Sequence, residues 1–240
     1  AGDISILATT GDVIITDVSA ATHGTVSITT LEGSMEGAAD NTVADIIGTT
    51  VTLAADGDNK GIGATTIIDI DADVLNLSTT SAAAATSGAI VIDDVSADIT
   101  ALTSITTGNE ANAGNITIDK SAGALTIGVI SAGGAAGLGN VTLLAATSIT
   151  ELTDDITIDI TGAIVDLTTA AGGITGNVTT FATDVLKALE VEASSLNLSS
   201  TSGDITITEA TGVTLTDIDS TTAGDISILA TTGDVIITDV

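Results

Sequence analysis

One eighteen-residue stretch occurs twice in this chain, and it limits the possible folds more than any other feature. Residues 1–18 and residues 223–240 both read AGDISILATTGDVIITDV, without a single difference. An identity of this length indicates a tandem repeat rather than chance. We therefore expect residues 1–222 to form one repeat and residues 223–240 to begin the next, in a window of a longer array.

The repeated stretch has the residue pattern of β-strands. Ile4 and Ile6 alternate with polar residues, and Val13 and Ile15 follow the same pattern after a Thr-Thr-Gly turn. Successive side chains of a strand point to opposite faces, so we expect these four residues to enter a core. The same strand–turn–strand unit returns along the whole chain, for example at residues 25–30, 50–55, 65–78, 115–120, 140–145, 155–161 and 203–208.

The spacing of these units predicts how the strands are arranged. Gly203 and Gly224 begin equivalent strands, and the sequence LNLS occurs at residues 75–78 and again at 196–199. Stacked units of this kind predict an all-β fold, a right-handed parallel β-solenoid (β-helix) of about 20–22 residues per coil. At about 4.8 Å per strand layer, ten or eleven coils would advance about 50 Å in one repeat.

Composition fits a narrow aliphatic core and excludes several classes of protein. The chain has no Pro, Cys, Trp or Tyr and one Phe, and its net charge is −29 from 32 acids against three basic residues. The absence of cysteine excludes a disulfide framework. The dense β-branched alternation argues against disorder. The acidic surface should repel nucleic acid. Because no apolar run reaches about 18 residues, we expect no membrane insertion.

Two groups of aspartates are candidate metal ligands. Asp69, Asp71 and Asp73 alternate along one strand, which predicts three carboxylates on one face. They could bind Ca²⁺ if a neighbouring coil supplied further oxygens, although a solvated outer face is the simpler interpretation. Asp56 and Asp58 resemble the start of an EF-hand loop. Lys60 and Ile67 stand where that loop needs ligands, so a complete EF-hand is not expected. No cofactor is predicted to be required, and Ca²⁺ is the one ion considered.

Catalysis has little chemical support in the sequence. His23 is the single histidine, and the chain lacks the arginine, tyrosine and tryptophan that sites for anionic sugars usually use. The acid pairs Asp93–Asp94 and Asp154–Asp155 are adjacent, so on a strand their side chains would point to opposite faces. We expect no enzymatic activity. A carbohydrate-active β-helix enzyme remains the third alternative.

Strings such as GDISILATTGDVIITD, GDITITEATGVTLTD, SAGALTIGVISAGG and GNVTLLAATSITELTDD resemble the repeat regions of giant secreted bacterial adhesins of the filamentous-haemagglutinin kind. The resemblance covers nearly the whole chain. It implies a structural segment of a long extracellular or cell-surface fibre, such as an adhesin shaft, matrix or attachment filament. The implied partners are neighbouring repeats or copies of the same protein, and cell-surface or matrix glycans. A calcium-dependent surface-layer or matrix-binding module is the alternative.

Overall fold

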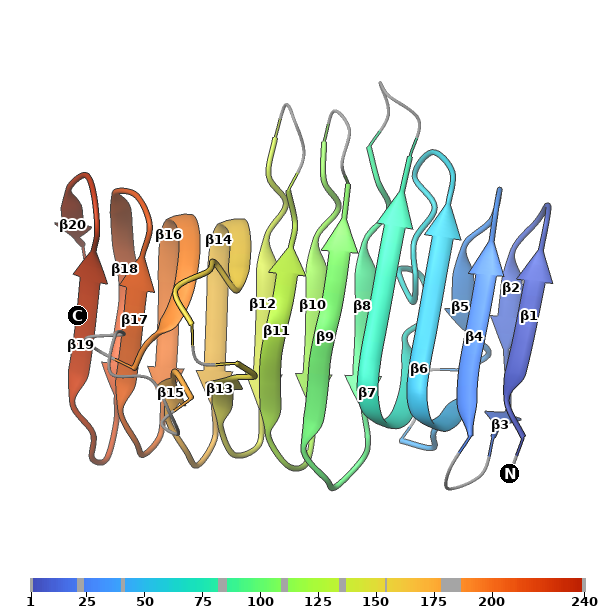
Figure 1. Cartoon of the computed structure of the whole chain (residues 1–240), viewed down its shortest axis with the longest axis horizontal. Helices are drawn as coiled ribbons and strands as arrows, with labels where there is room; N and C mark the ends of the chain where they lie inside the picture. The colour runs from blue at the N-terminus through green and yellow to red at the C-terminus, as the bar shows by residue number, and fades with distance from the viewer. Residues whose placement is uncertain are drawn as a thin grey trace.

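Alternating aliphatic residues form parallel strands that stack into a β-solenoid. The computed structural model describes residues 2–20, 24–39, 42–81, 86–108, 112–133, 137–153, 155–177 and 187–238. Within these ranges every helix-or-strand element is a β-strand, and the strands wind through about nine turns of about 24 residues each (Figure 1). The predicted fold class is confirmed.

The strands follow two rows along the solenoid axis. The first row contains β1 (Ile4–Ala8), β4 (Thr25–Thr30), β6 (Ile46–Asp56), β7 (Ile68–Thr80), β9 (Thr100–Thr107), β11 (Leu125–Ser131), β13 (Ile149–Glu151), β15 (Ile174–Thr175), β17 (Ile205–Glu209) and β19 (Ile226–Ala230). The second contains β2 (Val13–Ile15), β5 (Met35–Gly37), β8 (Ile90–Asp94), β10 (Ile116–Lys120), β12 (Val141–Ala145), β14 (Ile160–Thr169), β16 (Leu189–Ser200), β18 (Val213–Ser220) and β20 (Val235–Ile237). The short β3 (Val18–Ser19) pairs with the start of β6.

The direction of winding can be followed in Figure 1. Strands β4, β9 and β11 run upward on the near side, and the paler β8, β10 and β12 run downward on the far side, while the chain advances from right to left. This is a right-handed coil, as expected for parallel strands joined by crossovers.

The coils are longer and fewer than the sequence spacing suggested. Hydrogen bonds between equivalent positions of neighbouring coils measure the coil length. Near the ends of the chain they join Asp3 to Thr25, 22 residues apart, and Asp204 to Asp225, 21 residues apart. Between the ends they join Asn115 to Asn140, 25 residues apart, and Asp159 to Glu190, 31 residues apart. The predicted spacing matches only the end coils, so the expectation of ten or eleven coils was wrong.

The core is a set of aliphatic columns that run along the axis. Each column places one Ile, Leu or Val per coil directly over the next, because the strands are parallel and in register. The members of two such columns are no more than 2% exposed: Val26, Val51, Leu75 and Leu102 in the first row, and Ile90, Ile116, Val141 and Val165 in the second. Among the described residues, stacked aliphatic side chains fill this narrow interior.

The first coil tests the expected inward residues most directly. Ile15 is buried, and Ile4 and Val13 are partly buried against the core. Ile6 is 36% exposed, because β1 has a strand on one side only among the described residues. The inward set is therefore correct for Ile4, Val13 and Ile15, and Ile6 shows that a terminal coil covers only half of its own core.

Polar residues close the corners where strands end. The inward position at the end of several strands is Thr instead of an aliphatic residue. Thr107 donates its hydroxyl to the Gly114 carbonyl at 2.6 Å, and Thr79 donates to the Gly88 carbonyl at 2.7 Å. A Cβ on Gly114 would lie 2.2 Å from the Gly88 oxygen, so the corner needs glycine at this position. These bonds satisfy backbone carbonyls that turn away from the strand ladders.

The two LNLS segments lie in different rows of strands and share one local feature. Leu75 of β7 and Leu196 of β16 each precede a register shift in the pairing with the following coil. Such a bulge inserts one extra residue and re-aims the strand. The LNLS echo in the sequence thus corresponds to a duplicated structural feature.

Candidate functional site

Asp69, Asp71 and Asp73 do not share one open face. Asp71 and Asp73 are exposed on β7 and line a shallow depression together with Asp98. Asp69 is fully buried, which differs from the expected solvated row. The depression brings two of the three predicted ligands near a third acid from the next coil, and whether it binds Ca²⁺ stays a prediction.

Asp69 is buried because acids stack on both sides of it. The Asp69 N–H donates to Asp45 Oδ2 at 3.2 Å, and the Asp45 N–H donates to the Asp69 carbonyl at 2.7 Å. On the other side Asp69 pairs with Asp93, which pairs in turn with Asp119. With Asp17, which precedes the Val18–Ile46 pair, these residues put an aspartate at the same place in successive coils. We call Asp17, Asp45, Asp69, Asp93 and Asp119 the aspartate column.

Burial changes the electrostatics in the middle of the aspartate column. Asp17 and Asp119 are exposed, whereas Asp45 is 4% exposed. Loss of hydration raises the pKa of Asp45, and the hydrogen bond from the Asp69 N–H opposes that rise. Asp45 therefore takes up a proton more readily than an exposed aspartate does.

The loop with Asp56 and Asp58 is not an EF-hand. Asp56 ends β6 and accepts a hydrogen bond from the Thr80 hydroxyl, and the turn that follows has positive φ at Gly57 and Asn59. The two aspartates line a depression with Glu32 and Lys60. The strands on each side replace the helices that an EF-hand requires.

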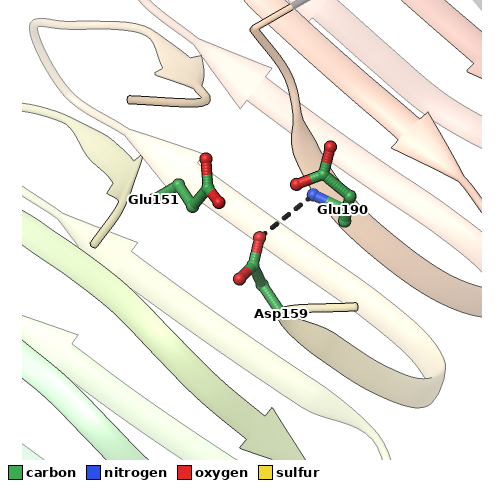
Figure 2. A group of neighbouring side chains, drawn as sticks. All are labelled: Glu151, Asp159 and Glu190. Carbon is green, nitrogen blue, oxygen red and sulfur yellow. Dashed lines mark hydrogen bonds between the residues drawn. The ribbon is translucent and has the colours of Figure 1, made fainter. Parts of the chain in front are cut away.

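A third group of acids was not predicted from the sequence. Glu151 ends β13, Asp159 directly precedes β14, and Glu190 lies in β16. One carboxylate oxygen from each lies within 4.8 Å of the others, and the three residues are between 1% and 5% exposed. Figure 2 shows the three side chains converging from three elements. We call Glu151, Asp159 and Glu190 the acid trio.

Backbone hydrogen bonds hold the acid trio in place. The Glu190 N–H donates to Asp159 Oδ2 at 3.2 Å (Figure 2), and the Asp159 N–H donates to the Glu190 carbonyl at 2.9 Å. Glu151 Oε1 accepts from the Asp155 N–H at 2.9 Å, and Glu151 Oε2 accepts from the Asn177 N–H at 3.3 Å. These contacts fix the carboxylates without supplying a positive charge.

Burial shifts the pKa of one member of the acid trio. Loss of hydration, together with the nearby charges of Glu151 and Asp155, raises the pKa of Asp159 to about 8, and the hydrogen bond from the Glu190 N–H opposes this rise. Two chemical roles fit such a group. It can retain a proton near neutral pH, or it can offer oxygen ligands to a hard cation such as Ca²⁺.

The acid trio has a sequence signal that follows from the LNLS echo. Extended upstream from LNLS, the echo aligns Asp69 with Glu190. Asp45 and Asp159 also match, since each begins a D-I-x-G segment and each accepts from the next acid's N–H at 3.2 Å. The Asp159–Glu190 contact is thus a second copy of the Asp45–Asp69 contact, with Glu151 added.

One ion pair is completely buried. Lys120 of β10 lies opposite Asp94 of β8 in the strand register, and its Nζ is 3.2 Å from Asp94 Oδ1, with both side chains inaccessible. Lys120 Nζ also donates to the Ser96 carbonyl at 2.6 Å and to the Ser96 hydroxyl. The Ser96 N–H donates to Asp94 Oδ1 at 3.0 Å. This places Asp94, half of a candidate catalytic acid pair, in a structural contact.

The remaining catalytic candidates are not brought together. His23 and Asp154 lie outside the described residues. Asp93 belongs to the aspartate column, on the opposite strand face from Asp94. In the part of the chain that the structure describes, these candidate catalytic residues do not come together as a nucleophile, a base and an acid.

Comparison of the chain with protein-family models, with curated proteins and with solved structures gives no match. Over the described ranges, the fold contains no helix with the length and apolar character needed to cross a membrane.

Proposed function

We propose that this chain is a structural segment of a long extracellular or cell-surface fibre, without catalytic activity. The observation that carries the proposal is the continuous stacking of about nine coils into one shaft. Parallel ladders link each coil to the next from β1 to β19 along the first row (Figure 1). A solenoid of this kind extends by adding coils, and its length provides spacing or reach.

The charge of the chain supports an exposed position for this shaft. Its net charge of −29 keeps neighbouring shafts apart and soluble. The resemblance of its coils to adhesin repeat regions supports attachment or matrix building as the purpose of the fibre. Copies of the same repeat and surface glycans are the partners that we propose.

Surface labelling tests the proposed location. Antibodies raised against residues 1–240 should label intact, unpermeabilised source cells, in filaments or at the cell surface, and permeabilisation should add little signal. An antibody against a cytosolic protein provides the control for membrane integrity. Labelling that appears only after permeabilisation would contradict an extracellular fibre.

A calcium-dependent binding module is the second candidate, and the convergence of three carboxylates in the acid trio favours it. We expect salt to stabilise the chain by screening its acids, and millimolar Ca²⁺ to stabilise it further than NaCl of equal ionic strength. The expected additional rise in melting temperature is about 3–6 °C, which corresponds to about 1–2 kcal/mol.

Variants of the two acid groups locate any calcium effect. Glu151→Gln should abolish the extra stabilisation if the acid trio binds the ion, and Asp71→Asn should abolish it if the depression with Asp73 binds it. Asp119→Asn, at an exposed position of the aspartate column, is the matched control. Equal responses to Ca²⁺ and NaCl in the parent chain would leave diffuse screening as the whole explanation.

A further inference from the structure

The two copies of the eighteen-residue stretch form the same pair of strands at opposite ends of the shaft (Figure 1). The strands β1 and β19 cover the same letters, ISILA, and β2 and β20 both cover VII. The turn between them also repeats, with φ of +82° at Gly11 and +79° at Gly233. A coil that fits against one copy therefore fits against the other.

In the first coil, the edge of β1 and β2 that faces the next coil is covered by residues 24–37. The Val13 N–H donates to the Ser34 carbonyl at 2.9 Å. The Thr25 N–H donates to Asp3 Oδ1 at 2.9 Å, and the Ser34 N–H donates to Asp12 Oδ1 at 2.8 Å. Hydrogen bonds to two aspartates and from one backbone amide thus fix the register of the second coil on the first.

The last coil presents the same groups without a coil over them. In the described part of the chain, β19 pairs with β17 and β20 pairs with β18, each on one side. Val235 is 41% exposed, whereas its register partner Val213 is 2% exposed. Asp225 and Asp234 stand at the positions of Asp3 and Asp12. The apolar and polar contacts needed to receive a coil are both in place.

Glycine at the start of the stretch gives independent support. A Cβ on Gly224 would lie 2.1 Å from the Gly203 oxygen of the coil beneath, so glycine is required there. At Gly2 a Cβ would meet nothing within 4 Å. The close backbone contact that requires glycine at Gly224 would also occur at Gly2 if a coil like the one that contains Gly203 lay beneath it.

We propose that the face formed by β19 and β20 is a docking surface for a solenoid coil with the sequence of residues 24–37, supplied by a following copy of this repeat. The inference rests on the proposed role as a fibre segment. It adds the surface and the register of the contact: successive copies of residues 1–222 join without a linker, in one continuous ladder.

A fusion protein tests the junction. Residues 1–240 followed directly by a second copy of residues 19–240 keep the native period. Amide hydrogen exchange at Val235 should slow at least about tenfold relative to the parent chain, because its N–H gains the acceptor that Val13 has in Ser34. Val213, whose N–H donates to the Asp234 carbonyl at 2.9 Å, is the internal reference in both proteins.

Two further comparisons show whether the register is specific. Joining two complete copies of residues 1–240 places the eighteen-residue stretch twice in succession. The coil from Ile226 to the second Ile4 is then shorter than the coil from Ile4 to Val26, so this fusion should not protect Val235.

The second comparison changes the polar contact. In the native-period fusion, Asp234→Ala should raise the amide exchange rate at Val235 about five- to tenfold, which removes most of the protection. Asp234→Asn should retain it, since Asn115 Oδ1 accepts the Asn140 N–H at 2.9 Å in the same manner.

The outcomes separate this inference from the proposed function. Unchanged exchange at Val235 in the fusion, with Val213 protected, would overturn the continuous junction and leave a fibre of jointed shafts. Fast exchange at Val213 in the parent chain would overturn the solenoid and the fibre role with it. Equal protection of Val235 in both fusions would also overturn the proposed register.

Discussion

Raising the pH from 6 to 8.5 should destabilise this protein by about 2–3 kcal/mol through Asp159 alone. The unfolded carboxyl, with an ordinary pKa of 3.8, is ionised throughout this window, whereas the folded one holds its proton up to about pH 8. The folded state binds more protons, so stability falls as pH rises. Between pH 4 and pH 8 the full effect is about 5 kcal/mol. Burial shifts the pKa of Asp45 in the same direction.

Melting temperatures recorded by circular dichroism between pH 6 and pH 8.5 measure this effect. We expect the melting temperature to drop by about 5–10 °C over the window. Asp159→Asn should remove most of the drop, because an amide does not ionise. His23→Gln controls for the single histidine, and an unaltered pH slope in Asp159→Asn would contradict the assignment.

Lys120→Met should cost about 4 kcal/mol, because it leaves the buried Asp94 carboxylate without its counter-ion. Asp94→Asn in the same chain should recover most of that loss, since no charge then remains at the site. Lys60→Met is the matched control: Lys60 Nζ lies 3.8 Å from Asp12 Oδ1 in an exposed pair, and its loss should cost less than about 0.5 kcal/mol. Urea denaturation of the four proteins checks the series. Equal costs for Lys60→Met and Lys120→Met would contradict the buried ion pair.

The sequence predicts the strands well because their two-residue alternation is local. In NITIDK, for example, Ile116, Ile118 and Lys120 share one face, and all three are buried in the structure. The alternation therefore also predicts that Lys120 points inward. It does not identify the residue that Lys120 contacts. Asp94 became that partner only through the pairing of β8 with β10, which belong to different coils.

The site was harder to predict because coil length varies. Alternation alone placed Asp69 with Asp71 and Asp73, but stacking on Asp45 and Asp93 buries Asp69. The acid trio depends on a long coil, in which Asp159 and Glu190 are neighbours although 31 residues separate them in the sequence. A fixed spacing like that of the end coils cannot bring these two residues together. The internal duplication carries that information, since it aligns Glu190 with Asp69 despite the longer coil.

Stretching single molecules between their two ends tests whether stacked coils form a continuous structural shaft. Each coil contacts mainly its neighbours, so coils should detach one or a few at a time. With about 24 residues per coil, each step should release on the order of 80 Å of chain. We expect a series of such steps at repeated force peaks. Release of the whole chain in one event would contradict it, since that result would show a single cooperative core in place of a stack of coils.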